Sequence, residues 1–146
     1  MRKQARKIGL AIVGAGRVGL IRGELAARHP AVEWIGIAEK NPERAKLVAD
    51  KVGAEFVTAD YKELIARPEV NALIVSTDEH LHVDPILAAC ERGIPMLIEK
   101  PLATDLGESQ MVMDALEAAG IDAVIGYTQR FRRRWLVAKE KVRSGS

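Results

Sequence analysis

Six short apolar runs, rich in valine and isoleucine, recur along this chain and are separated by longer amphipathic stretches. Short continuous runs of this composition are typical of parallel strands that are buried on both faces. The alternation predicts right-handed strand–helix–strand crossovers, and so an α/β fold: one domain with a doubly wound parallel six-stranded sheet and helices on both faces. The expected strands span residues 7–13, 33–39, 54–58, 71–76, 95–98 and 122–126.

The stretches between these runs carry helix start and stop signals. Asn41 can cap a helix whose first position is Pro42, and Gly53 is a typical helix end. The expected helices span 17–29, 41–51, 60–68, 80–92, 105–119 and 132–142, and the last three residues are expected to form a frayed end.

Composition restricts the class of protein further. In 146 residues, 48% are apolar and 29% charged, which suits one globular domain. Cys90 is the only cysteine, so an intramolecular disulfide and a multi-cysteine metal site are excluded. No apolar run is long enough to cross a membrane and no secretory signal is present, so we expect a cytoplasmic protein with no membrane contact.

Charge is distributed unevenly. Residues 8–129 carry 11 basic and 19 acidic side chains, whereas the two ends together carry 11 basic side chains and one acid. An acidic body repels nucleic acid, so no nucleic-acid partner is expected. The basic stretch 130–143 leaves binding of a phosphorylated ligand or nucleic acid as an alternative.

The predicted organisation is a basic tail at 1–7, the domain at 8–130, and a C-terminal helix and tail at 131–146.

A glycine motif follows the first expected strand. Gly14, Gly16 and Gly19 match G-x-G-x-x-G between a strand and a helix, which is the context of a dinucleotide-binding, Rossmann-type fold. The first glycine permits the tight turn, the second lets a pyrophosphate approach the backbone, and the third allows close helix–strand packing. Free N–H groups at the helix start would face the phosphates. The alternative is a glycine turn that serves packing only.

Other polar residues follow later strands, at the edge where ligands bind in such sheets. Glu39 lies twenty residues after Gly19, where an acid can bind both ribose hydroxyls and favour NAD, although Lys40 leaves NADP open. The alternative for Glu39 is an ordinary surface acid. Ser76 and neighbouring groups would border the cofactor.

Two histidines and a lysine also follow expected strands. His80 and His82 are two residues apart, do not share a helical face and lack a third ligand, so no metal site is expected. His82 could equally be a satisfied helix-start residue. Lys100 follows the fifth strand, where it could bind a substrate hydroxyl or act as acid or base if desolvation disfavours its charged form. The alternative is a lysine that extends into solvent.

Together these features resemble the Gfo/Idh/MocA family, the glucose–fructose oxidoreductase and inositol dehydrogenase-like enzymes. The resemblance runs from about residue 8 to 145, and its most specific feature is Glu99-Lys100-Pro101. The sequence departs from the family's usual Thr-Pro-Asn by reading Thr77-Asp78-Glu79. The other shared features are the glycine motif, the segment from Thr77 to His82, and Gly126-Tyr-Thr-Gln-Arg-Phe131.

The resemblance implies a role for each matching residue. Arg17 and Val18 would supply backbone N–H groups to the pyrophosphate, Thr77 and His82 would flank the cofactor, and Glu99 would contact it. Lys100 would lie near the nicotinamide and the reacting hydroxyl, and Gln129 or Arg130 would reach the active site. The predicted cofactor-binding residues are thus Gly14, Gly16, Arg17, Val18, Gly19, Glu39, Lys40, Ser76, Thr77, His82, Glu99, Lys100 and Gln129, with Lys100 also the predicted catalytic residue.

The implied function is the NAD(P)-binding domain of an oxidoreductase. It would transfer hydride between the nicotinamide and a secondary alcohol of a sugar or cyclitol. Enzymes of this family continue into a second α+β domain that holds the substrate, so this chain is expected to be incomplete without it and could self-associate as a homo-oligomer. The alternative function is a non-enzymatic sensor or regulatory module that binds NAD(H).

Overall fold

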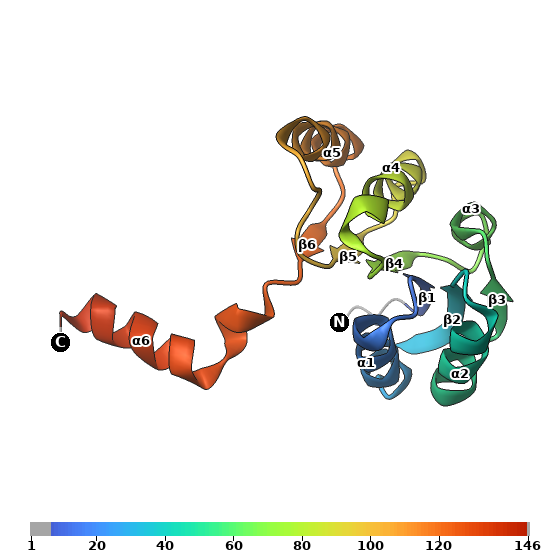
Figure 1. The fold of residues 1–146 in the computed structure, drawn as a ribbon, viewed down its shortest axis with the longest axis horizontal. Coiled ribbons are helices and arrows are strands. Elements are labelled where there is room, and N and C mark those ends of the chain that lie inside the picture. The colour runs from blue at the N-terminus through green and yellow to red at the C-terminus, as the bar shows by residue number, and fades with distance from the viewer. Residues whose placement is uncertain (1–6, 146) are drawn as a thin grey trace, which may run out of the picture.

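The computed structural model describes residues 7–145, which form a six-stranded, all-parallel sheet with helices on both faces (Figure 1). The strand order is β3-β2-β1-β4-β5-β6, which confirms the predicted doubly wound sheet. The strands are β1 (Ile8–Val13), β2 (Val32–Ala38), β3 (Phe56–Thr58), β4 (Ala72–Val75), β5 (Met96–Ile98) and β6 (Ala123–Ile125).

The helices follow the strands in strict alternation. They are α1 (Arg17–Ala27), α2 (Pro42–Val52), α3 (Tyr61–Ile65), α4 (Val83–Glu91), α5 (Leu106–Ala119) and α6 (Arg133–Ser144), with short 3-10 helices η1 (Glu79–Leu81) and η2 (Thr128–Phe131). Figure 1 shows α1 and α2 on one face of the sheet, and α3, α4 and α5 on the other. Helix α6 runs away from the sheet, and all its residues are exposed.

The predicted start of α2 is confirmed in detail. The Asn41 side chain accepts a hydrogen bond from the Arg44 N–H at 2.9 Å, and Pro42 occupies the first helical position. Gly53 ends the helix with φ of +68°, a conformation that costs glycine little. Capping signals are local, which is why the sequence locates this helix closely.

Two helical expectations need correction. The expected helix over 80–92 is a 3-10 turn, η1, followed by α4, and Pro85 lies in the first turn of α4. Proline has no N–H to donate and is tolerated only there, so the α-helix begins just before it. Ser144, expected in a frayed end, is the last residue of α6, and Gly145 closes that helix with φ of +71°. Ser146 and residues 1–6 of the predicted basic tail lie outside the described residues.

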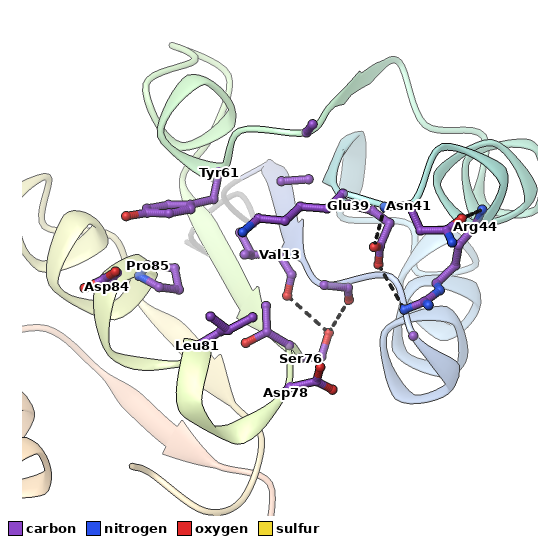
Figure 2. Close-up of a pocket in the computed structure, with 16 residues that line it drawn as sticks. Val13, Glu39, Asn41, Arg44, Tyr61, Ser76, Asp78, Leu81, Asp84 and Pro85 are labelled. Atoms are coloured by element: carbon purple, nitrogen blue, oxygen red, sulfur yellow. Dashed lines mark hydrogen bonds and ion pairs between the residues drawn. The ribbon is translucent and has the colours of Figure 1, made fainter. Parts of the chain in front are cut away.

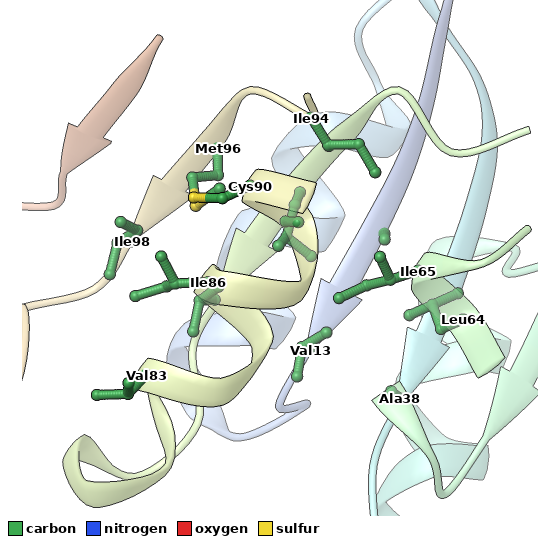
Figure 3. Close-up of a cluster of buried hydrophobic side chains, with 14 of the residues drawn as sticks. Val13, Ala38, Leu64, Ile65, Val83, Ile86, Cys90, Ile94, Met96 and Ile98 are labelled. Atoms are coloured by element: carbon green, nitrogen blue, oxygen red, sulfur yellow. The ribbon is translucent and has the colours of Figure 1, made fainter. Parts of the chain in front are cut away.

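Aliphatic side chains fill both faces of the sheet. On the α3–α5 face, Leu64, Ile86 and Val112 from the three helices meet β1, β4 and β5 (Figure 3). On the α1–α2 face, Val48 and Val52 pack on Ile12 and its neighbours. Strand order reverses between β1 and β4, so the crevice beyond the carboxyl ends of these strands is where a ligand is expected. In residues 7–145, no helix has the length and apolar character needed to span a bilayer.

Cys90 lies on the buried face of α4, in the core, and is 9% exposed (Figure 3). Burial raises the pKa of its thiol, because the thiolate loses hydration there.

We therefore expect a disulfide reagent to modify Cys90 much more slowly in the native chain than in urea. The unfolded thiol ionises at a lower pH than the buried one, so its ionisation favours the unfolded chain. The free energy of unfolding is therefore unaffected below the ordinary thiol pKa of about 8.5 and falls as the pH rises above it. Urea unfolding at pH 7 and pH 9.5 should show this loss, with Cys90→Ala reducing it. Equal labelling rates in both states would contradict the burial.

Candidate cofactor site

A cavity of about 370 Å³ lies beyond the carboxyl ends of β1, β2 and β4, where the strand order predicts a ligand (Figure 2). This volume is in the usual range for small-molecule sites. Of the predicted residues, it is lined by Gly14, Gly16, Glu39, Lys40, Ser76 and Thr77. It is also lined by residues that the sequence did not single out for binding, among them Asn41, Arg44, Tyr61, Asp78, Asp84 and Pro85.

The three glycines of the loop meet different spatial demands. Gly14 has φ of +89°, and a Cβ there would lie 2.5 Å from the Thr77 nitrogen. A Cβ on Gly19 would collide with the Gly14 carbonyl oxygen. By contrast, a Cβ on Gly16 would meet no atom of the described residues within 4 Å, its neighbours in the chain aside. Gly14 and Gly19 are thus required by the fold, whereas Gly16 leaves an open space that the protein does not fill.

Helix α1 begins at this open space. Gly16 is its N-cap, no side chain caps the helix, and its first turn contains no acidic residue. The first backbone N–H groups of a helix have no partner within it, and the helix dipole places partial positive charge there. This end of α1, which includes Arg17 and Val18, therefore fits an anionic group such as a diphosphate.

Two hydroxyl groups after β4 flank the loop. Ser76 Oγ donates to the Gly14 carbonyl oxygen at 2.7 Å and so ties the loop to β4. Thr77 Oγ1 is buried and has no hydrogen-bond partner among residues 7–145. An unpaired buried hydroxyl is unfavourable, so its place on the cavity wall suits a ligand that can complete its bonding.

Glu39 is held in place by two backbone amides. Its Oε2 accepts from the Ala15 N–H and its Oε1 from the Asn41 N–H, both at 2.9 Å. The Arg44 guanidinium lies 3.6 Å from Oε2, and the Glu39 side chain is only 9% exposed. These contacts contradict the alternative of an ordinary surface acid. They join the glycine loop to the start of α2 and fix a carboxylate on the cavity wall (Figure 2).

His82 lies behind the cavity, not on its surface. It is 1% exposed, with Nδ1 2.8 Å from the Pro101 carbonyl oxygen and Nε2 3.2 Å from the Thr77 carbonyl oxygen. The alternative reading, a satisfied helix-start histidine, describes this position better than a direct neighbour of the cofactor. The ring joins the segment after β4 to the segment after β5.

The remaining predicted residues lie beyond the cavity, at the ends of β5 and β6. Glu99 forms an ion pair with Arg22 of α1. Lys100 is exposed, and nothing among residues 7–145 forms a hydrogen bond or ion pair with it. Gln129 Oε1 accepts from Trp135 Nε1 at 3.3 Å. The structure therefore brings the glycine loop, Glu39 and the β4 end together, but does not place these three residues in the same cavity.

Sequence reasoning missed the wall formed by Tyr61 and Asp84. Tyr61 follows β3, so its place after a strand end was the signal that could have indicated it. Burial raises the pKa of the Tyr61 hydroxyl, and the nearby Asp84 and Asp60 carboxylates add to the shift. Arg44 was also missed, since its place in the first turn of α2 indicated only helix formation.

The sequence profile of the GFO_IDH_MocA family, described as an oxidoreductase family with an NAD-binding Rossmann fold, matches residues 8–127. The chain belongs to this family. It is an NAD-binding Rossmann domain, as the resemblance implied. Curated relatives include inositol 2-dehydrogenase from Rubrobacter xylanophilus, with 30% identity over all of this chain and 42% of the relative. D-xylose 1-dehydrogenase (NADP(+)) 2 from Haloferax volcanii is 32% identical over 90% of this chain and 41% of the relative.

Solved structures of similar proteins share the fold. Apo scyllo-inositol dehydrogenase from Lactobacillus casei gives a TM-score of 0.89 at 21% identity. The match covers 98% of this chain and 43% of the dehydrogenase chain. Levoglucosan dehydrogenase in complex with NADH gives a TM-score of 0.85 at 28% identity. That match covers 96% of this chain and 40% of the levoglucosan dehydrogenase chain. The chain thus spans about two fifths of the length of the GFO_IDH_MocA relatives that it matches.

Proposed function

We propose that the chain binds the diphosphate of NAD(H) at the loop from Gly14 to Gly19 and the adenosine ribose at Glu39. The observation that carries this proposal is the empty space at Gly16, directly beside the uncapped start of α1. The unpartnered Thr77 hydroxyl and the buried Glu39 carboxylate border the same cavity. The diphosphate of NAD(H) would accept hydrogen bonds from the backbone amides at the start of α1. The hydroxyls of the adenosine ribose would donate hydrogen bonds to the Glu39 carboxylate.

The charges around Glu39 bear on the choice between NAD and NADP. Glu39 would repel a 2′-phosphate, which favours NAD. Lys40 and Arg44 line the same wall and are both exposed, so a 2′-phosphate would also meet two cations. We propose NAD as the preferred cofactor, with weaker binding of NADP.

We further propose that the whole protein oxidises a secondary alcohol of a sugar or cyclitol, or reduces the corresponding ketone. Relatives named for inositol, xylose and levoglucosan support this substrate class. The bound nicotinamide supplies the hydride chemistry. Lys100, exposed and unpaired among the described residues, would donate a hydrogen bond to the reacting oxygen and assist its proton transfer. Substrate binding would require a second domain, as in the family.

Calorimetric titration with NAD, NADH and NADP tests the cofactor proposal. We expect binding of NAD and NADH and weaker binding of NADP. NAD at 100 times its Kd should add about 2.7 kcal/mol to the free energy of unfolding, because only the native chain binds it. Glucose 6-phosphate is the control, since it is a phosphorylated sugar without adenosine. Failure of millimolar NAD and NADP to bind or to shift the melting temperature would contradict the assignment.

A further inference from the structure

An enclosed ion pair connects α1 with the end of β5. Nε and Nη2 of Arg22 both contact Oε1 of Glu99. Their side chains are 20% and 12% exposed, and every other ion pair among residues 7–145 has at least one partner that is more than one third exposed. Enclosure strengthens the attraction, and it makes the loss of either partner costly because a charge is left unpaired.

The end of β6 makes room for this pair. Gly126 is buried, and its N–H donates to the Ile98 carbonyl oxygen at 2.7 Å. A Cβ at position 126 would lie 2.8 Å from Arg22 Nη2 and 2.9 Å from Glu99 Oε1. The ion pair therefore occupies the space that a side chain at 126 would need, so α1, β5 and β6 meet at one charged contact.

The contact lies on the nicotinamide side of the proposed cofactor site. A doubly wound sheet has two mononucleotide-binding halves, one on each side of the strand reversal. Glu39 follows β2 and belongs to the half formed by β1, β2 and β3, so the second nucleotide is expected over β4, β5 and β6. Glu99 continues β5 through its N–H, which donates to the Val75 carbonyl oxygen at 2.9 Å, and Lys100 is the next residue.

We propose that Arg22 is a positioning residue for the nicotinamide half of the cofactor. It neutralises the Glu99 carboxylate and fixes the backbone that presents Lys100. This inference rests on the proposed cofactor site. Without Arg22, the unpaired carboxylate would attract the cationic ring of NAD more strongly than the neutral ring of NADH. Arg22 therefore keeps the two redox forms of the cofactor closer in affinity.

Titration of Arg22→Met with ADP-ribose, NAD and NADH tests this role. ADP-ribose lacks the nicotinamide, so its Kd should stay within about twofold of the value for the unaltered chain, because α1 still presents the same amides. The ratio of the Kd for NADH to the Kd for NAD should rise about fivefold, the effect of one unpaired charge near the ring. Adding Glu99→Gln should return the ratio to its original value. Arg28→Met, which removes an exposed cation at the end of the same helix, should leave the ratio unchanged.

Glu99→Gln alone provides an independent test should Arg22→Met fail to fold. It leaves the Arg22 cation without its partner, so the Kd ratio should fall, opposite to the effect of Arg22→Met. An unchanged ratio in either single variant, or equal losses for all three ligands, would overturn the role of Arg22 and leave the cofactor site standing. If the unaltered chain bound neither ADP-ribose nor NAD, both proposals would be overturned.

Discussion

Gly16→Val is expected to leave the fold intact and to remove dinucleotide binding. Gly16 has φ of −67° and ψ of −170°, an extended conformation open to valine, and its added Cβ would meet no atom within 4 Å in the part of the chain that the structure describes, sequence neighbours aside. The free energy of unfolding should therefore change by about 0.5 kcal/mol or less. The same side chain would occupy the space of the diphosphate. Loss of two charge-assisted hydrogen bonds would weaken NAD binding by about 100-fold or more.

Gly14→Ala is the matched comparison, because it should produce the opposite result. Its positive φ and the 2.5 Å approach of its Cβ to the Thr77 nitrogen predict a loss of stability of about 2 kcal/mol or more. Urea unfolding and calorimetric titration of both variants separate a glycine required by the fold from one required by the ligand. Unchanged NAD affinity in Gly16→Val would show that the diphosphate lies elsewhere.

Glu39→Ala is expected to weaken NAD binding by about 30-fold, because the ribose loses two hydrogen bonds to a carboxylate. NADP should lose less, since the repulsion of its 2′-phosphate by Glu39 disappears while Lys40 and Arg44 remain. Stability should also fall by about 1–2 kcal/mol, because the Ala15 and Asn41 N–H groups lose their acceptor. Calorimetry with both cofactors and urea unfolding measure these effects.

Glu55→Ala is the control for this charge change. Glu55 is exposed, precedes β3 and does not line the cavity, so its removal should leave both cofactor affinities unchanged. Equal losses of NAD and NADP affinity in Glu39→Ala would refute the assignment of Glu39 to the ribose, because a shared loss indicates damage to the glycine loop.

The sequence located the features whose causes are local. The apolar runs set the strands, and those of β1, β4 and β5 are buried on both faces, whereas Val57 of β3 and Val124 of β6 are exposed at the sheet edges. Asn41 and Gly53 set the limits of α2 through contacts within a few residues. The Gly14 turn was predictable for the same reason, since a positive φ is a property of one residue. Strand ends depend also on the neighbouring strand. The run expected at 54–58 forms a strand only from Phe56, which pairs with Gly36 of β2.

Features that depend on distant pairs were beyond sequence reasoning. His82 was left between two interpretations, and the choice came from the Pro101 carbonyl oxygen, 19 residues away. Arg22 looked like any other helix residue, because its partner Glu99 is 77 residues further along the chain. Local periodicity and composition therefore specify the elements and the glycine turn after β1. Which side chains meet across the sheet depends on strand order and on the space left by residues such as Gly126, and only packing in three dimensions sets these.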